Sequence, residues 1–373
     1  MGTAAARRGS CYRISYFYKR SLNGGDQNHV LDRPLRRLPK RTGSGHTNGY
    51  TEKTGVSNLE KHPECVAERP DATGPRFEAL AAREAQLGPG LFVQRLLPTR
   101  TRRSIGPWCF LDHFGPSDAT MDVPPHPHIG LQTVTWLFEG AVVHRDSIGS
   151  VQSIRPGQLN LMTAGRGIAH AELAEQRHSA RLHGAQLWVA LPDRDRNAEP
   201  SFEHHAELPR IRCDAIDATV FMGSFAGEHS IARASSPIAG VELLFTSSGA
   251  AQLPLDRTFE YALLLVGGAA ECEGQQLSAQ TLYDLGTGRS TLRIEGTRES
   301  RLLLIGGAPF NETVLMWWNF VARTSEEMAQ ARTDWETGTR FGNVAGAGQR
   351  LSAPPYAIRV KPPSAESTDA RSE

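Results

Sequence analysis

Residues 125–137 read PHPHIGLQTVTWL: two histidines two positions apart, followed directly by an apolar run. Further along the chain, residues 165–172 read GRGIAHAE. In a β-strand successive side chains point to opposite faces, so His126 and His128 share one face, and so do His170 and Glu172. If the two pairs face each other inside a β-barrel, three imidazoles and one carboxylate surround one point. The two stretches therefore predict a metal site within an all-β fold.

The donor types indicate which metals suit such a site. Structural zinc sites are usually closed tetrahedra rich in thiolate, and Cys109 is the one cysteine near the histidines in the sequence. Imidazole and carboxylate donors with open positions suit Fe(II), Mn, Ni or Cu, and we expect Fe(II) first. A single His-x-His pair on a strand is more often an ordinary polar pair, but the separate His-x-Glu pair favours a metal site.

Composition excludes several classes of protein. The 373 residues include 41 Lys and Arg against 40 Asp and Glu, so the whole chain has no charge signature of nucleic-acid or membrane binding. No apolar run has transmembrane length or resembles a signal-peptide core. We expect a cytoplasmic protein, or a nuclear one in a eukaryote, because the scattered cysteines indicate a reducing compartment without a disulfide framework. They stand at positions 11, 65, 109, 213 and 272.

The two ends of the chain differ from its middle. Residues 1–75 are rich in Arg, Gly, Ser, Asn and Thr without lasting hydrophobic periodicity, and we expect a disordered basic extension. A targeting segment and a wrongly assigned start codon would look the same. We expect no nucleic-acid contact from this tail. The Pro-, Ser- and charge-rich residues 351–373 predict a second disordered tail.

Between these ends, short apolar runs alternate with turn signals, which is typical of jelly rolls and barrels. We expect an N-terminal metal-binding barrel at 76–194, a linker at 195–207 and a C-terminal barrel at 208–350. Where the first barrel has His-x-His, the second has Arg257-Thr258-Phe259, so we expect no second metal site. Thr324 and Glu327 form a capping box that predicts a helix, with Met328, Ala331 and Trp335 along its apolar side.

Several longer segments resemble the pirins, a family of the cupin superfamily built as two stacked barrels. The resemblance covers roughly residues 78–345 and implies two tandem cupin (jelly-roll) barrels with a short C-terminal helix. The segments that carry it are FLDHFG (110–115), PHPHIG (125–130), TVTWLFEG (133–140), VHRDS (143–147), RPG (155–157), MTAGRGIAHAE (162–172), LHGAQLWV (182–189), GAPFNE (307–312) and RFG (340–342).

The resemblance implies an iron held by His126, His128, His170 and Glu172, the residues that the spacing also selects. The common cupin pattern has a Glu soon after its His-x-His, whereas here Gln132 stands near that place and Glu172 supplies the carboxylate. We expect His113, His144 and His183 as candidates to orient the ligands, with ordinary structural histidines as the equal alternative.

Some pirins are similar in activity to quercetin 2,3-dioxygenases, which open a flavonol ring with O2, and nuclear pirins are redox-sensitive transcriptional cofactors. Fold alone does not choose between these. We expect a dioxygenase acting on a flavonol-like enol or catechol, with Glu172 also serving as base. Phe110, Trp136 and Met162 are candidates for an apolar wall of the pocket. The alternative is a non-enzymatic regulator whose metal controls the binding of a protein partner.

Overall fold

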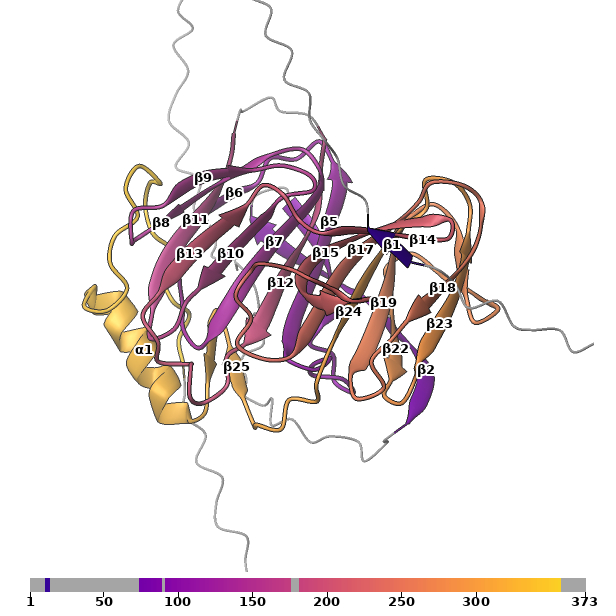
Figure 1. Cartoon of the computed structure of the whole chain (residues 1–373). Coiled ribbons are helices and arrows are strands. Elements are labelled where there is room, and N and C mark those ends of the chain that lie inside the picture. Colours follow the sequence, from indigo (N-terminus) through magenta and orange to yellow (C-terminus); the bar gives the residue numbers. More distant parts are fainter. Residues whose placement is uncertain (1–10, 14–73, 89–90, 176–180, 357–373) are drawn as a thin grey trace, which may run out of the picture. The chain divides into compact units, whose positions relative to one another are not determined.

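The computed structural model describes residues 11–13, 74–88, 91–175 and 181–356. Nearly all of the predicted basic extension and most of the predicted C-terminal tail lie outside these residues. Figure 1 shows the described elements coloured along the sequence, and they are almost entirely β-strands with one C-terminal helix. The predicted fold class is confirmed.

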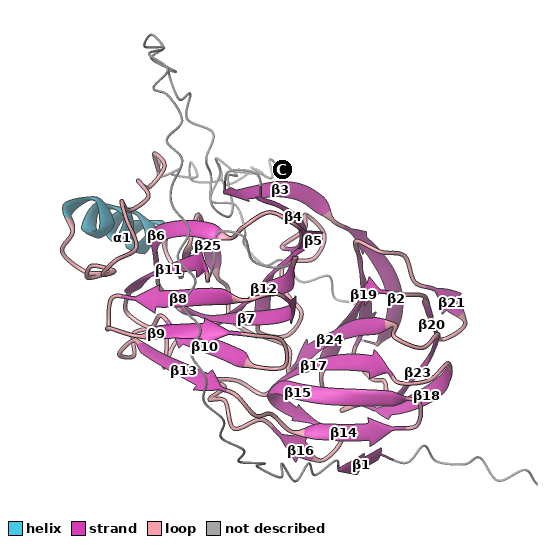
Figure 2. Ribbon diagram, turned by 90° about the horizontal axis from the view of Figure 1, so that it is seen from above, coloured by secondary structure: helices cyan, strands magenta, loops and turns pink. Residues whose placement is uncertain are grey.

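Two sheets form the first barrel (Figure 2). The larger has the order β13-β10-β7-β12-β5-β4-β3 and the smaller the order β6-β11-β8-β9. The strands of the larger sheet are β3 (Arg83–Gly88), β4 (Leu91–Leu97), β5 (Trp108–Ser117), β7 (Leu131–Glu139), β10 (Leu159–Thr163), β12 (Leu182–Ala190) and β13 (Ser201–His205). Those of the smaller sheet are β6 (Asp122–His128), β8 (Val142–Asp146), β9 (Val151–Ile154) and β11 (Ile168–Ala174).

The second barrel repeats this design with a larger and a smaller sheet. The larger has the order β1-β14-β15-β17-β24-β19-β22-β2, with β16 on β15, and the smaller the order β18-β23-β20-β21. The strands are β1 (Cys11–Arg13), β2 (Pro75–Ala81), β14 (Arg210–Cys213), β15 (Ile216–Phe225), β16 (Glu228–His229), β17 (Ile238–Phe245), β18 (Gly249–Pro254), β19 (Glu260–Gly267), β20 (Ala270–Cys272), β21 (Gln275–Gln276), β22 (Thr281–Gly286), β23 (Thr291–Gly296) and β24 (Arg301–Gly307).

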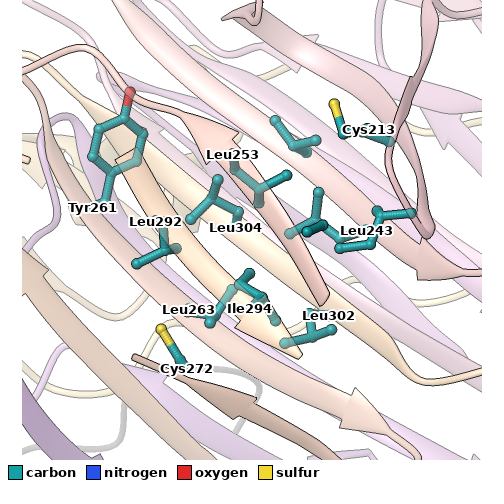
Figure 3. Close-up of a cluster of buried hydrophobic side chains, with 14 of the residues drawn as sticks. Cys213, Leu243, Leu253, Tyr261, Leu263, Cys272, Leu292, Ile294, Leu302 and Leu304 are labelled. Atoms are coloured by element: carbon teal, nitrogen blue, oxygen red, sulfur yellow. The ribbon is translucent and has the colours of Figure 1, made fainter. Parts of the chain in front are cut away.

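The interior of the second barrel is apolar where the first barrel carries its histidines. Figure 3 shows Leu263, Ile294 and Leu304 packed together with their neighbours. Among the described residues, the one group of three His, Cys, Asp or Glu side chains close enough to hold a metal lies in the first barrel. The apolar side chains of this core are not metal ligands.

Successive side chains of some strands point alternately into the core of the second barrel and into the hydrophobic interface between the two barrels. On β24, Leu302 and Leu304 face the core of the second barrel, whereas Leu303 and Ile305 pack against residues of the first. Trp136 of β7 stacks on Phe221 of β15 with ring centroids 4.8 Å apart. Both faces of these strands are therefore buried, one inside a barrel and one between the barrels.

The chain crosses between the barrels at both ends of the fold. β2, which begins the predicted first domain, pairs with β22 of the second barrel. β25 (Leu315–Trp317), β26 (Phe320–Ala322) and helix α1 (Ser325–Thr337) come after the second barrel but pack on the first. In Figure 2, α1 lies beside β6 and β11. The domain boundaries predicted from the sequence therefore do not coincide with the limits of the two barrels in the structure.

The predicted helix has the predicted cap and buried side. The Thr324 side chain accepts a hydrogen bond from the Glu327 N–H, and Glu327 accepts one from the Arg323 N–H. The buried helix residues are Met328, Ala331 and Trp335. The capping box fixes the start of the helix at its N-terminus. The apolar side of the helix packs against Ile129 and Ala169 of the first barrel.

Three local features differ from the expectations or add to them. The predicted linker at 195–207 contains β13, which pairs with β10 and widens the first barrel. Cys109 and Cys272 are buried, and Cys213 is disulfide-bonded, an exception to the expected absence of a disulfide framework. No helix among the described residues is long and apolar enough to cross a membrane.

Gly130 provides a test of how the C-terminal segment docks. Its φ is +69°, and a Cβ built there would lie 2.1 Å from the carbonyl oxygen of Val321. We expect Gly130→Ala to lower the free energy of unfolding by about 2 kcal/mol or more, since a side chain in this conformation is strained and also clashes. Urea denaturation of the metal-free protein measures this. Gly267→Ala, where a Cβ would meet nothing within 4 Å, is the matched control, and equal midpoints for the two variants would contradict the expectation.

Candidate metal centre

Two neighbouring strands bring the predicted ligands together. β6 and β11 run antiparallel, so that His126 lies opposite His170 and His128 opposite Ile168. β6 is an edge strand of its sheet, which explains how it tolerates prolines that cannot donate to a ladder. The pairing shifts between His170 and Glu172, where Pro124 and Pro125 form an irregularity opposite Ala171.

Three imidazoles converge in the interior of the first barrel. The ligand nitrogens of His126, His128 and His170 all lie within 4.8 Å of one another, and all three side chains are buried. The Nε2 atoms of His128 and His170 are 3.0 Å apart. Such close, buried ring nitrogens are arranged as they would be around a cation.

Backbone carbonyls determine which nitrogen of two of these rings carries the proton. The Nδ1 of His126 is 2.8 Å from the carbonyl oxygen of Pro124, and the Nδ1 of His128 is 3.0 Å from that of Asn319. A carbonyl oxygen only accepts, so each Nδ1–H donates and each Nε2 of a neutral ring keeps its lone pair. His126 and His128 are therefore in the tautomer that binds a metal through Nε2.

Burial keeps the three rings neutral. It lowers the pKa of His126 to about 4, against the opposing effect of the hydrogen bond to Pro124. It also lowers the pKa values of His128 and His170 well below the usual value, with neighbouring histidines adding to the effect. Neutral imidazoles are the form that ligates, so no protons need to be displaced from these rings near neutral pH.

Glu172 adds a carboxylate to the same pocket. It is buried, and the hydroxyl of Thr135 donates to its Oε1 over 2.9 Å. Burial raises the pKa of Glu172, while His144 and the hydrogen bond from Thr135 act in the opposite direction. Glu172 lines the same pocket as the three histidines but is not part of the group whose donor atoms lie within 4.8 Å of one another. Three imidazoles with a carboxylate nearby are donor types that fit a non-haem iron, manganese, nickel or copper ion, and such a cation would compensate the buried carboxylate.

An aromatic wall lines the rest of the pocket, whose volume is about 370 Å³ including the space open to solvent. Phe110 and Trp188 stack with centroids 4.0 Å apart, and Trp188 meets the ring of His128 edge-on. The remaining lining residues are Leu87, Asp112, Met121, Val123, His126, His170, Glu172 and Gln186. This surface suits a flat aromatic molecule next to the histidines.

A buried ion pair supports that wall. The guanidinium of Arg95 donates to both oxygens of Asp112, over 2.8 and 2.7 Å, and lies 4.6 Å from the centre of the Phe110 ring. Bidentate pairing satisfies both charges away from water, and the cation over the ring fixes the position of Phe110. The sequence showed opposite charges on two predicted strands here but no sign that they meet.

Not every residue predicted for the site lies in it. His144 contacts the ring of His170, but His113 and His183 hydrogen-bond to each other, with Nε2 atoms 2.8 Å apart, beside Phe138. Of the predicted apolar wall, Phe110 lines the pocket. Trp136 instead donates to Glu242 between the barrels. Met162 belongs to the same buried cluster as Phe110 and Trp188 but does not line the pocket.

The structure adds two groups that the sequence did not indicate. The carbonyl of Asn319, from the loop between β25 and β26, holds His128, and the hydroxyl of Thr135 holds Glu172. A backbone carbonyl has no sequence signal because every residue carries one. For the contact between Thr135 and Glu172, the sequence offered one indication, which is that Thr135 is a polar residue on the strand that follows the histidines.

Comparison with known proteins identifies the relatives of this chain. The Pirin family model matches residues 90–189, and the model for the Pirin C-terminal cupin domain matches residues 240–342. The chain is 45% identical over 315 residues to a Pseudomonas aeruginosa protein named "putative quercetin 2,3-dioxygenase", covering 82% of this chain and 99% of that protein. It is 37% identical to a pirin-like protein of Caulobacter vibrioides, covering 69% of this chain and 92% of that one.

A solved structure agrees with these matches. The crystal structure of a quercetin 2,3-dioxygenase from Acinetobacter baumannii superposes with a TM-score of 0.74 at 43% identity, covering 76% of this chain and 97% of that one. The similarity extends over both barrels, because nearly the whole of that chain is matched.

The His113–His183 pair makes stability depend on pH. Burial, and then its neighbour, lower the pKa of His113 to about 4, and burial followed by Arg301 and Arg181 lowers that of His183 to about 4. Unfolded histidine titrates near pH 6.5, so the unfolded chain binds more protons between about pH 6.5 and 4. We therefore expect the free energy of unfolding to fall as the pH drops through this window.

Urea denaturation of the metal-free protein at pH 7 and at pH 4.5 measures the effect. His113→Gln keeps a hydrogen-bonding side chain but does not titrate, so its stability should fall less than that of the unsubstituted protein. The other buried histidines are present in both proteins and cancel in the difference. If the free energy of unfolding fell equally with pH in His113→Gln and in the unsubstituted protein, the His113–His183 pair would not contribute to the pH dependence of stability.

Proposed function

The chain belongs to the pirin family, and on that premise we propose that it is a metal-dependent dioxygenase of the quercetin 2,3-dioxygenase kind, with Fe(II) as its metal. The observation that carries the proposal is the convergence of three buried, neutral imidazoles in a pocket that Glu172 and an aromatic wall also line. The name of the Pseudomonas relative at 45% identity supports the same activity. The substrate class is a flat molecule with an acidic enol or catechol hydroxyl, together with O2.

His126, His128, His170 and Glu172 would hold the metal. When bound, it would supply a Lewis acid that favours the deprotonated hydroxyl of the substrate and a meeting point for that substrate and O2. The two Nδ1–H donors to Pro124 and Asn319 hold the first two rings in place before any ligand arrives. The protein's contribution is thus a fixed donor set that does not reorganise.

Glu172 is the residue suited to take the hydroxyl proton. Burial raises its pKa, which brings the carboxylate closer to the acidity of an enol or catechol hydroxyl. Thr135 donates to Oε1 and so orients the group, with the proton passing from the substrate oxygen to a carboxylate oxygen. The base and the ligand set lie in one pocket.

Phe110 and Trp188 orient the substrate. Their stacked rings present an apolar face next to His128, and Leu87, Met121 and Val123 complete an apolar lining that excludes water. Exclusion of water strengthens the electrostatic interactions within the pocket and protects a reactive substrate anion from protonation by solvent. A flat ring lying on this wall would direct its hydroxyl toward the histidines.

The first experiment is anaerobic purification with metal analysis, followed by measurement of O2 uptake and loss of flavonol absorbance with quercetin. We expect iron-dependent turnover, and His126→Ala should lose both bound metal and turnover because it removes one ligand. His183→Ala removes a buried histidine outside the pocket and should keep its metal. Bound metal without O2 uptake on a panel of flavonols and catechols would reject the dioxygenase and favour a regulator that binds a protein partner.

A second experiment tests the role of Glu172. Glu172→Gln keeps the size of the side chain but removes the base, and general base catalysis typically contributes a factor of about 10² to 10⁴. We expect kcat to fall by about 100-fold or more, with metal content measured on the same samples. Glu242→Gln is the matched control, because desolvation also raises the pKa of Glu242, but this half-buried carboxylate accepts a hydrogen bond from Trp136 between the barrels. If both variants turned over at the same rate, Glu172 would not be the base.

A further inference from the structure

His170 is the one ring of the three imidazoles whose Nδ1 faces another imidazole. That nitrogen lies 3.3 Å from the Nδ1 of His144, whereas the other two rings face carbonyl oxygens. A carbonyl can only accept, but a neutral imidazole nitrogen either donates or accepts, depending on its tautomer. The contact with His144 therefore does not by itself determine which nitrogen of His170 has the lone pair.

Asp146 removes this ambiguity. Its Oδ2 lies 3.1 Å from the Nε2 of His144, and an ionised carboxylate only accepts, so the Nε2–H of His144 donates. The Nδ1 of a neutral His144 is then an acceptor, and the Nδ1–H of His170 donates to it. His170 is left with its lone pair on Nε2, directed at the Nε2 of His128, 3.0 Å away.

The surrounding structure fixes the positions of Asp146 and His144. The Oδ1 of Asp146 accepts hydrogen bonds from the backbone N–H groups of Ile148 and Ser150, over 3.1 and 2.8 Å, which fixes the orientation of the carboxylate. The ring of Phe202 stacks on His144 with centroids 4.3 Å apart and planes 16° apart. Both Asp146 and His144 are only 3% exposed, so water does not substitute for either partner.

We propose that Asp146 and His144 form a positioning relay for His170. In this hydrogen-bonded series the N–H groups of His170 and His144 point away from the candidate metal centre, which leaves the Nε2 of His170 free to bind the metal. The relay rests on the proposed metal site but not on the dioxygenase activity. His128 also presents a lone pair at the centre, so two lone pairs face each other across 3.0 Å and a cation between them satisfies both. Asp146 is thus a positioning residue that acts through His144.

The substitution Asp146→Asn should reverse the direction of the hydrogen bonds that run from His170 through His144 to residue 146. The amide oxygen would stay on the backbone N–H groups of Ile148 and Ser150, which leaves the amide N–H facing the Nε2 of His144. His144 would then carry its proton on Nδ1 and donate to His170, which would carry its proton on Nε2 and donate to His128. Every hydrogen bond is satisfied in this arrangement, but a proton occupies the place of the metal.

The test measures metal affinity without substrate or O2, by competition of Ni(II), and of Fe(II) under anaerobic conditions, with a chelator. We expect Asp146→Asn to weaken binding by about 10- to 100-fold, the usual effect of residues that orient ligands. His144→Phe keeps a ring on Phe202 but frees His170 to choose its tautomer, so its loss should be smaller than that of Asp146→Asn. Asp122→Asn, the same change at an exposed position of β6, should bind as the unsubstituted protein does.

A second readout concerns the metal-free protein. In ¹⁵N-histidine NMR spectra at pH 8, we expect the His170 proton on Nδ1 in the unsubstituted protein and on Nε2 in Asp146→Asn. The relay is rejected if Asp146→Asn binds metal as tightly as the unsubstituted protein, if His144→Phe weakens binding as much as Asp146→Asn, or if the His170 tautomer does not change. Failure of the dioxygenase assay alone would leave these results standing, since none of them depends on turnover.

Discussion

Three neutral imidazoles can direct their lone pairs at one point only if each has somewhere else to donate its remaining N–H. In this protein the three acceptors come from three different parts of the chain. Pro124 lies at the irregularity of β6, Asn319 in the loop between β25 and β26, and His144 on β8. Because the rings are buried, no water replaces these acceptors, so the geometry of the centre depends on the whole first barrel and on the segment that follows the second.

That dependence links the second barrel to the candidate site, although the one group of possible metal ligands among the described residues lies in the first barrel. Its apolar core supports one face of a sheet whose other face packs on the first barrel, as the alternation of Leu302 to Ile305 shows. The chain leaves this barrel and returns to the first through β25, β26 and α1, where it places the carbonyl of Asn319 on His128. A first barrel cut from the chain at residue 194 would lack this acceptor.

Buried histidines serve two different purposes in this structure. Burial lowers the pKa of His126 and of His113 alike to about 4. A ring nitrogen of His126 lies within 4.8 Å of ring nitrogens of His128 and His170, whereas the Nε2 of His113 is occupied by a hydrogen bond to His183. A lowered pKa therefore marks burial in both cases, and the partner of the remaining ring nitrogen separates the candidate metal centre from a structural pair.

Local patterns in the sequence were enough to predict the all-β fold, the capped helix with its buried Met328, Ala331 and Trp335, and the meeting of His126, His128 and His170. Each of these depends on strand or helix periodicity and on turn residues, which act over a few positions. Tertiary structure alone decided that Trp136 faces the other barrel and that His113 pairs with His183. It also decided that the carbonyl of Asn319 lies on His128 and that Asp146 lies on His144. Strands buried on both faces show no polar side in their sequence, and a contact between residues far apart in the chain depends on how the sheets pack.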